Sequence, residues 1–257
     1  MNTLARLSHA AVALTSLGAL TSFSTQADTL LGVYAGGQMW AMETEGAFAS
    51  NNDLSSFRFD DERNASLYVA FEHFVPLILN AKIISTSMDT DGTAVLANQF
   101  SFGGESFAVD ANLSTDLALS TIDYILYYEI LDNDLFSFDI GVNAKKIDGD
   151  ITVVDQDTGS VSDMSFSGYI PMAYSRAELG LPFTNWSIFA EGSYLSLNDH
   201  TVSDLQAALE YRLIDSLAVN LTMQIGYRAM NIELDDLDGV YSELEFSGAY
   251  AGIEFHF

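Results

Sequence analysis

Apolar and polar residues alternate with a period of two along most of the chain. In the clearest run, 217–227, Leu, Val, Leu, Met, Ile and Tyr occupy every second position, with polar or small residues between them. Segments 136–144 and 205–213 repeat this pattern. A period of two gives a β-strand one apolar and one polar face. The runs suit tilted membrane-spanning strands, which need about 9–11 residues.

The same pattern, followed along the whole chain, predicts ten strands. They cover residues 30–41, 65–75, 80–88, 116–129, 135–147, 165–180, 185–197, 201–212, 217–229 and 244–257. The third and sixth strands are the weakest. Lys82 disturbs the alternation of the third, and Pro171 lies inside the sixth. A proline there removes a hydrogen-bond donor unless it lies at a bulge or a strand rim.

The connections between these strands have a second rhythm. Alternate connections are very short and contain turn formers such as Asn133, Pro182 and Asp215. The connections between them are long, except for 198–200. The long segments are 42–64, 89–115, 148–164 and 230–243. Short periplasmic turns and long outward loops are typical of outer-membrane barrels, and an even strand count places both termini in the periplasm.

Two features indicate that the apolar faces point outward to lipid. The polar faces carry charged residues that we expect to pair across neighbouring strands in a polar lumen. These are Arg176, Glu178, Glu191, Glu210, Arg212 and Arg228. Aromatic residues gather near the predicted strand ends, as in interfacial girdles. They are Trp40, Tyr127, Tyr128, Phe136, Trp186 and Tyr227. The sequence therefore predicts an all-β fold, a single antiparallel transmembrane β-barrel.

The N-terminal residues have the pattern of a secretory signal peptide. Arg6 precedes an apolar stretch, 7–20, and small residues at Thr25 and Ala27 form a cleavage site. The apolar stretch is too short, and too often interrupted by Ser, Thr and His, to span a bilayer. We expect cleavage after Ala27, so that residues 1–27 are the signal peptide and residues 28–257 form the barrel.

The C-terminal strand ends in an apolar alternation that includes Phe255 and Phe257. This ending resembles the signal that the outer-membrane barrel assembly machinery reads. Several stretches also resemble an uncharacterised family of proteobacterial outer-membrane β-barrel proteins. They are ADTLLGVYAGGQMW, FEHFVPLILN, YYEILDNDLFSFDIGVNAKKIDGD, LDDLDGVY and YAGIEFHF. The resemblance implies the outer membrane of a Gram-negative bacterium, and it implies no activity.

Composition excludes several classes of function. The net charge of −27 argues against a nucleic-acid partner, which needs a basic surface. The chain has no Cys, which excludes disulfides, thiol catalysis and Cys-ligated zinc. Apolar residues make up 49% of the chain, more than a disordered protein of this charge would have.

Acidic residues are concentrated in the predicted outer segments. Diffuse binding of Ca²⁺ or Mg²⁺ is one interpretation, because carboxylate oxygens are hard ligands. Asp236, Asp238 and Glu245 are weak candidates for a specific site, since the sequence around them matches a calcium loop only in part. The simplest interpretation is a solvated acidic surface. The sequence predicts no other cofactor.

The case for an enzyme is weak. His200 follows Asp199 in a predicted outer connection, an arrangement similar in kind to that of the omptin proteases. No second acidic pair can be placed opposite it. Serine is abundant, but the chain contains no G-x-S-x-G motif. We therefore expect no catalysis.

The function predicted from the sequence is that of a non-enzymatic outer-membrane barrel with acidic extracellular loops. It would contribute to envelope integrity or to surface interactions. Its expected partners are outer-membrane lipid and lipopolysaccharide, with the barrel assembly machinery during biogenesis. A small cation-preferring, porin-like pore is the alternative. A rim enzyme of the protease or lipid-hydrolase type is a third hypothesis.

Overall fold

The computed structural model describes residues 31–257, except 76–77, 134, 198–199 and 217. The predicted signal peptide lies outside this part. The regular elements described are all strands: β1 (Leu31–Ala49), β2 (Ser55–Phe59), β3 (Glu62–His73), β4 (Asn80–Val95), β5 (Phe100–Phe102), β6 (Glu105–Phe107), β7 (Asn112–Asp132), β8 (Phe136–Asp155), β9 (Val161–Gly180), β10 (Trp186–Leu197), β11 (His200–Asp215), β12 (Asn220–Leu237) and β13 (Val240–His256). Among the described residues, no helix is long and apolar enough to cross a membrane.

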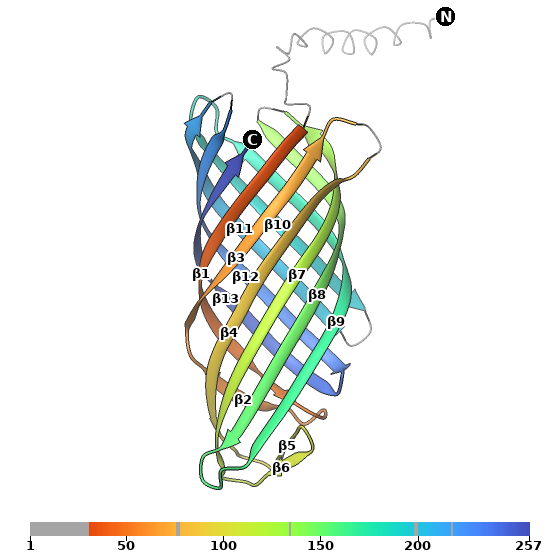
Figure 1. Ribbon diagram of the computed structural model, residues 1–257, viewed down its shortest axis with the longest axis vertical. Helices are drawn as coiled ribbons and strands as arrows, with labels where there is room; N and C mark the ends of the chain where they lie inside the picture. Colours follow the sequence, from red (N-terminus) through yellow and green to blue (C-terminus); the bar gives the residue numbers. More distant parts are fainter. Residues whose placement is uncertain (1–30, 76–77, 134, 198–199, 217) are drawn as a thin grey trace, which may run out of the picture. The chain divides into compact units, whose positions relative to one another are not determined.

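Ten long strands in the described chain form a closed antiparallel barrel (Figure 1). Strands β7 to β13 pair in sequence order, β4 pairs with β7 and β3, and β1 pairs with β3. The ring closes where β1 meets β13, from Tyr34 opposite His256 to Ala49 opposite Tyr241. The short strand β2 pairs with β1 and β4 on the outer side of the start of β3, where it takes the place of β3 between them. This confirms the predicted all-β antiparallel barrel of about ten strands.

The positions of Lys82 and Pro171 explain why the third and sixth predicted strands have irregular patterns. Lys82 is on the inward face of β4 and is buried, so it does not interrupt the lipid-facing side. Pro171 lies on β9 opposite Ala144 of β8. The pairing of β9 with β10 stops at Ala173, so Pro171 has a neighbouring strand on one side only. Such an edge position is where sheets tolerate proline.

The barrel has two unlike ends. The turns between β3 and β4, β7 and β8, β9 and β10, and β11 and β12 lie at the end where β1 begins and the chain terminates (Figure 1). We call this the inner end and the opposite one the outer end. The short turns and the C-terminus therefore share one end, as the sequence predicted.

The prediction of long outer loops was wrong for most of their length. Strands β7 and β8 contain 21 and 20 residues, and they continue far into segments predicted as loops. A strand tilted by about 40° rises roughly 2.5 Å per residue along the barrel axis, so 20 residues rise about 50 Å. An apolar membrane band is only about 25 Å tall. The outer half of the barrel therefore extends beyond the band.

The reason is a reversal in the chemistry of the two strand faces. In β8, Ile140 and Val142 point outward and are exposed, whereas Ile147, Ile151 and Val153 point inward and are buried. Side chains still alternate with a period of two, but the apolar positions change phase near Lys145. The inner half has an apolar outside and a polar inside, and the outer half has the opposite arrangement. The alternation of apolar residues on one face therefore stops at this point, and the pattern alone predicts the end of a strand there.

An apolar core fills the outer half of the barrel. Its largest buried side chains include Trp40, Met42, Phe48, Phe100, Phe102, Met88, Leu117 and Phe246. The hairpin β5–β6 lies at the outer end (Figure 1) and contributes Phe100, Phe102 and Phe107. Phe48 packs on Phe102 with ring centroids 5.2 Å apart. We call this group the outer apolar core.

The aromatic girdle was predicted only in part. Tyr128, Trp186 and Tyr227 are exposed on the outward face. Trp40 and Tyr127 are instead 2% and 3% exposed and point into the barrel, so they belong to no girdle. Both have inward parity on their strands. The girdle was predicted from nearness to a strand end alone, which does not distinguish inward from outward residues.

Candidate functional site

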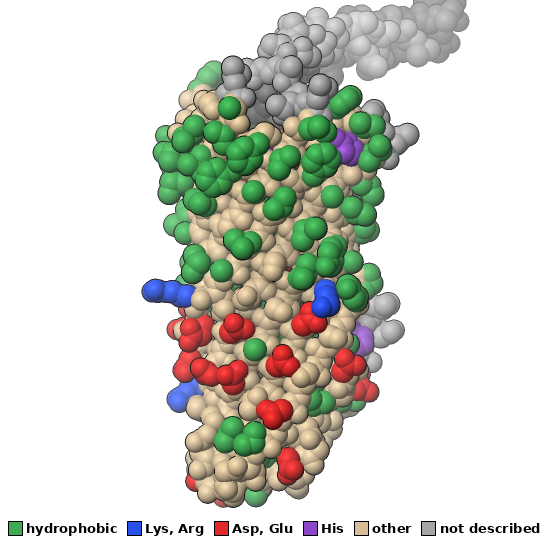
Figure 2. Space-filling view, viewed as in Figure 1, with side chains coloured by type: hydrophobic (Ala, Val, Ile, Leu, Met, Phe, Trp, Pro, Cys, Tyr) green, Lys and Arg blue, Asp and Glu red, His purple; other side chains and the backbone are tan. Residues whose placement is uncertain are grey.

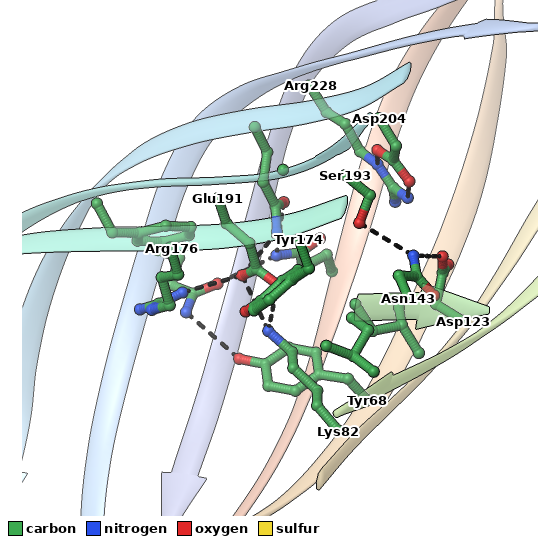
Figure 3. Close-up of a pocket in the computed structure, with 17 residues that line it drawn as sticks. Tyr68, Lys82, Asp123, Asn143, Tyr174, Arg176, Glu191, Ser193, Asp204 and Arg228 are labelled. Carbon is green, nitrogen blue, oxygen red and sulfur yellow. Dashed lines mark hydrogen bonds and ion pairs between the residues drawn. The ribbon is translucent and has the colours of Figure 1, made fainter. Parts of the chain in front are cut away.

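A network of charged side chains crosses the middle of the barrel (Figure 3). Each of the strands β4 and β7 to β12 contributes one member. We call these residues the charge network: Lys82, Asp123, Lys145, Arg176, Glu191, Asp204 and Arg228. All of them have inward parity, because charged side chains cannot face the lipid without a large cost.

The first centre of the charge network surrounds Glu191. Lys82 Nζ donates to both oxygens of Glu191, at 2.7 and 2.9 Å. Arg176 Nη1 donates to Glu191 at 3.0 Å. The other arm of Arg176 donates to Glu178 at 2.9 Å and lies 3.8 Å from Glu210. One buried carboxylate is therefore neutralised by two cations from different strands.

The second centre surrounds Lys145, whose side chain is 0% exposed. Its ammonium lies 2.8 Å from the carboxylate of Asp123 and 2.9 Å from that of Asp204. Arg228 donates to both oxygens of Asp204, at 2.8 and 2.7 Å, and to Ser66 at 2.9 Å. Such two-pronged pairs are strong and directional. Pairing on every side keeps buried charges from being left uncompensated.

The structure brings together four of the six residues predicted for the lumen. Arg176, Glu178, Glu191 and Glu210 form the first centre. Arg228 belongs to the second centre and pairs with Asp204. Arg212 must be corrected: its side chain is 54% exposed and lies 3.8 Å from Asp215 at the inner end. Arg212 pairs with Thr222 in the regular register, just before a register shift in the β11–β12 pairing, so it lies at the inner rim and not at the depth of the charge network.

Sequence reasoning missed four members of the charge network. They are Lys82, Asp123, Lys145 and Asp204. A signal for them existed, since each is a charged residue within a strand long enough to cross a membrane. Such a residue has to face the lumen. The pattern of alternation predicts that such a residue points inward. It does not predict which residue across the barrel it pairs with.

The lumen is closed. A cavity of about 30 Å³ remains beside the charge network, between Tyr68, Tyr174 and Gln206. This volume holds water but no larger ligand. The outer apolar core lies on the outer side of the network, and its side chains are packed against one another. Among the described residues, the charge network and this core together fill much of the interior.

Acidic side chains also line the interior near the inner end. Glu129 of β7 lies directly opposite Asp139 of β8, and both have inward parity. Tyr127 donates from its hydroxyl to Glu72 at 2.6 Å. Tyr68 donates to Glu254 at 2.7 Å. The inner mouth is therefore anionic.

A belt of carboxylates lies on the outward face of the outer half, on strands β1, β4, β7, β8, β9, β12 and β13. On the face drawn in Figure 2, acidic side chains lie beyond the apolar band, with basic side chains at the border. We call them the acidic belt: Glu43, Glu45, Asp89, Asp91, Asp116, Asp148, Asp150, Asp163, Glu233, Glu243 and Glu245.

Several members of the acidic belt lie directly opposite one another on neighbouring strands. The pairs are Glu45 with Glu245, Asp91 with Asp116, and Glu233 with Glu243. Like charges in directly opposite positions destabilise a sheet. At the β8–β9 turn, hydrogen bonds from Thr158 and from the Asp157 backbone lower the pKa of Asp155. The outer surface is therefore strongly anionic and self-repelling.

The weak calcium candidates do not come together. Asp236 lies near the end of β12 and Asp238 lies in the β12–β13 turn, with positive φ angles of 61° and 51°. Their carboxylates accept backbone N–H groups of Gly239 and Ser167, each at 3.1 Å. Glu245 lies on β13 opposite Glu45. Among the described His, Asp and Glu residues, no three are placed to hold a metal ion.

The histidine at the outer end is tied to the backbone. Nδ1 of His200 accepts a hydrogen bond from the N–H of Asp235 at 3.2 Å, which links β11 to β12. Asp199, the neighbour considered with it, lies outside the described residues. His256 at the inner end stacks on Tyr34, with centroids 4.0 Å apart.

The C-terminal residues complete the ring at the inner end. Phe257 is 56% exposed, and its ring stacks on that of Phe255 with centroids 6.3 Å apart. The backbone of Phe257 exchanges two hydrogen bonds with Val33, at 2.9 and 3.2 Å. The predicted assembly signal thus lies on the seam where the barrel closes.

Comparison with known proteins supports the fold. No family model and no curated protein matches the chain. The outer-membrane protease OmpT from Escherichia coli superposes with a TM-score of 0.51 at 7% identity, covering 88% of this chain and 97% of that one. The transport unit of the Escherichia coli autotransporter AIDA-I gives 0.42 at 8% identity, over 89% and 91%. The Pseudomonas putida toluene transporter TodX gives 0.33 at 6% identity, over 89% and 90%. The chain has the fold of Gram-negative outer-membrane barrels.

Proposed function

We propose that this protein is a non-enzymatic, closed barrel of the Gram-negative outer membrane that contributes to envelope integrity. The observation that carries the proposal is the position of the acidic belt, which begins where the lipid-facing apolar band ends (Figure 2). In an outer membrane, this level is that of the lipopolysaccharide phosphates. The belt would therefore connect the protein to the outer leaflet.

Divalent cations would make this connection. The belt and the lipopolysaccharide phosphates are both anionic, so they repel each other unless ions lie between them. Mg²⁺ and Ca²⁺ bind carboxylate and phosphate oxygens and can retain waters. Each opposed pair of the belt would gain, because a shared cation removes the mutual repulsion of its two carboxylates. Lys146 and Arg63, also on the outward face, add direct contacts with phosphate.

The closed interior supports a structural role over the alternative of a cation-preferring pore. Both the charge network and the outer apolar core would have to open before ions could pass. A protease role has less support. OmpT is a protease, but its 7% identity supports the fold alone. His200 already accepts a hydrogen bond from the backbone of Asp235. The proposal therefore assigns no catalysis to this chain.

The test is thermal unfolding in vesicles that contain lipopolysaccharide, with magnesium, calcium or sodium at equal ionic strength. We expect the divalent salts to raise the unfolding temperature more than sodium does. Simple screening would make the three salts equivalent. Equal unfolding curves in all three salts would contradict the proposal.

A matched pair of variants shows where the ions act. Glu45→Gln with Glu245→Gln removes an opposed pair of the acidic belt. Asp53→Asn with Glu105→Gln removes the same charge from exposed outer residues that are not in the belt. We expect the divalent effect to shrink in the first variant and to persist in the second. An unchanged effect in both would leave the belt as a solvated acidic surface.

A further inference from the structure

The turns at the inner end are unusually apolar. Large apolar side chains are exposed in or beside each of the four turns: Phe74 (66%), Ile78 (54%), Leu131 (51%), Leu135 (47%), Phe183 (108%) and Ile214 (45%). The outer connection at 156–160 is by contrast Gln-Asp-Thr-Gly-Ser, and 50–53 is Ser-Asn-Asn-Asp. Connections exposed to water are normally polar. The exposed apolar residues of the outer connections are fewer and smaller, Val95, Val109 and Val161. The larger apolar residues at the inner end therefore indicate that this end meets a different environment.

The height of the apolar band indicates that the environment of the inner turns is the membrane. Twelve positions separate Leu31, the first residue of β1, from Glu43, and twelve separate Phe136 of β8 from Asp148. At roughly 2.5 Å per residue, each stretch rises about 30 Å. A band about 25 Å tall uses nearly all of this height. If the acidic belt lies just outside the band, the turns lie within a residue or two of its inner boundary.

Phe183 in the β9–β10 turn gives independent support. Its φ is +63°, a conformation that favours Gly or Asn and that is costly for a bulky side chain. The N–H of Thr184 closes the turn on the carbonyl of Leu181 at 3.2 Å, with Pro182 preceding Phe183. Glycine or asparagine would fit this place in such a turn better. The aromatic ring makes no use of the barrel interior, since the residue is fully exposed.

We propose that the six turn residues form an apolar collar that inserts into the inner leaflet of the membrane. The partner is phospholipid, contacted at the level where headgroups meet acyl chains. The collar is continuous with the lipid-facing band through Leu179 and Trp186, which are exposed beside the same turn as Phe183. This inference rests on the membrane insertion of the proposed function. It adds that the described turns at the inner end, with polar neighbours such as Asn133 and Asp215, lie at the inner boundary of the membrane and not beyond it.

Site-directed spin labelling tests the collar, and the absence of Cys from the chain makes single labelling sites clean. Nitroxide labels are placed at Phe183→Cys in the collar, Val142→Cys on the lipid-facing part of β8 and Asn52→Cys in an outer connection. The protein is folded into phosphatidylethanolamine–phosphatidylglycerol vesicles. Accessibility is measured to oxygen, which concentrates in the bilayer, and to a water-soluble nickel chelate. We expect the oxygen-to-nickel ratio to exceed one at 183 and 142 and to fall below one at 52.

The outcomes separate this inference from the proposed function. A ratio below one at 183 with a ratio above one at 142 would overturn the collar while the barrel remains inserted. A ratio below one at 142 as well would overturn membrane insertion itself. A label at 183 that is shielded only in native membranes, and wet in pure lipid, would indicate a periplasmic protein partner and would also overturn the collar. If Phe183→Cys does not fold, Leu135→Cys replaces it, because this collar residue lies in the β7–β8 turn.

Discussion

Replacing Lys145 by Met tests whether the charge network holds the barrel together. Met has a similar volume, so the change removes the charge without leaving a large cavity. The side chain is 0% exposed and contacts Asp123 and Asp204 at 2.8 and 2.9 Å. Removing one partner from a buried ion pair costs about 3–5 kcal/mol. Asp204 keeps Arg228, so mainly Asp123 loses its cation, although Asn143 still donates a hydrogen bond to it. We expect a loss near the lower limit, about 3 kcal/mol of unfolding free energy.

The assay is urea unfolding in lipid vesicles, followed by tryptophan fluorescence. Trp40 is a suitable reporter because it is buried and lies 5.1 Å from the guanidinium of Arg228. Lys146→Met is the matched control, since this neighbour is partly exposed and pairs with Asp148 at the surface. It should change the unfolding free energy by less than about 0.5 kcal/mol.

A second variant shows whether an unpaired charge causes the loss. Adding Asp123→Asn to Lys145→Met removes the uncompensated carboxylate, and should reduce the loss to about 1 kcal/mol. If Lys145→Met is as stable as the unaltered protein, the network does not stabilise the barrel. If the double variant is no more stable than the single one, the loss does not come from an unpaired charge.

Three further predictions concern the wall, the outer core and the seam. Asn64→Ala should lower the free energy of unfolding by about 1–3 kcal/mol. The Asn64 side-chain amide exchanges two hydrogen bonds of 3.1 Å with the backbone of Asp89, where β3 and β4 have no backbone pairing. Unchanged hydrogen exchange at the Asp89 amide would contradict this prediction. Phe100→Ala should lower the free energy of unfolding in urea by about 3–5 kcal/mol, since Phe100 is 0% exposed in the outer apolar core. A loss below about 1 kcal/mol, as for a surface change, would mean that the core is loosely packed. Deleting Phe257 should reduce the amount of protein in the outer-membrane fraction, because both hydrogen bonds to Val33 are lost, and full recovery there would contradict its role in assembly.

The inner half of the barrel could be predicted from the sequence because lipid imposes a simple rule. Apolar residues must face outward there, so the period-two runs gave the strand number and the antiparallel ring. The outer half follows the opposite rule, since water surrounds it and its own core fills it. Ile147, Ile151 and Val153 continue β8 with the reverse polarity. Applying the lipid-facing rule to the whole strand therefore predicts an end for β8 that is too early.

The lumen was predictable by face but not by partner. Parity identified Arg176 and Glu191 as inward residues, and the structure places them 3.0 Å apart. Lys82 reaches Glu191 from the far side of the barrel, and only the stagger and tilt of the closed ring bring them together. Arg212 shows the converse case, because it shares the parity of Glu210 but lies too close to the inner end to reach the charge network.

Conductance in planar lipid bilayers tests the closed barrel most directly. Purified, folded protein is added to one side, and current is recorded at both polarities in monovalent salt. We predict no steady conductance, because the charge network and the outer apolar core fill the lumen beside a cavity of about 30 Å³. Stable conductance steps with cation preference would contradict this prediction, and would favour a pore whose selectivity comes from the anionic inner mouth.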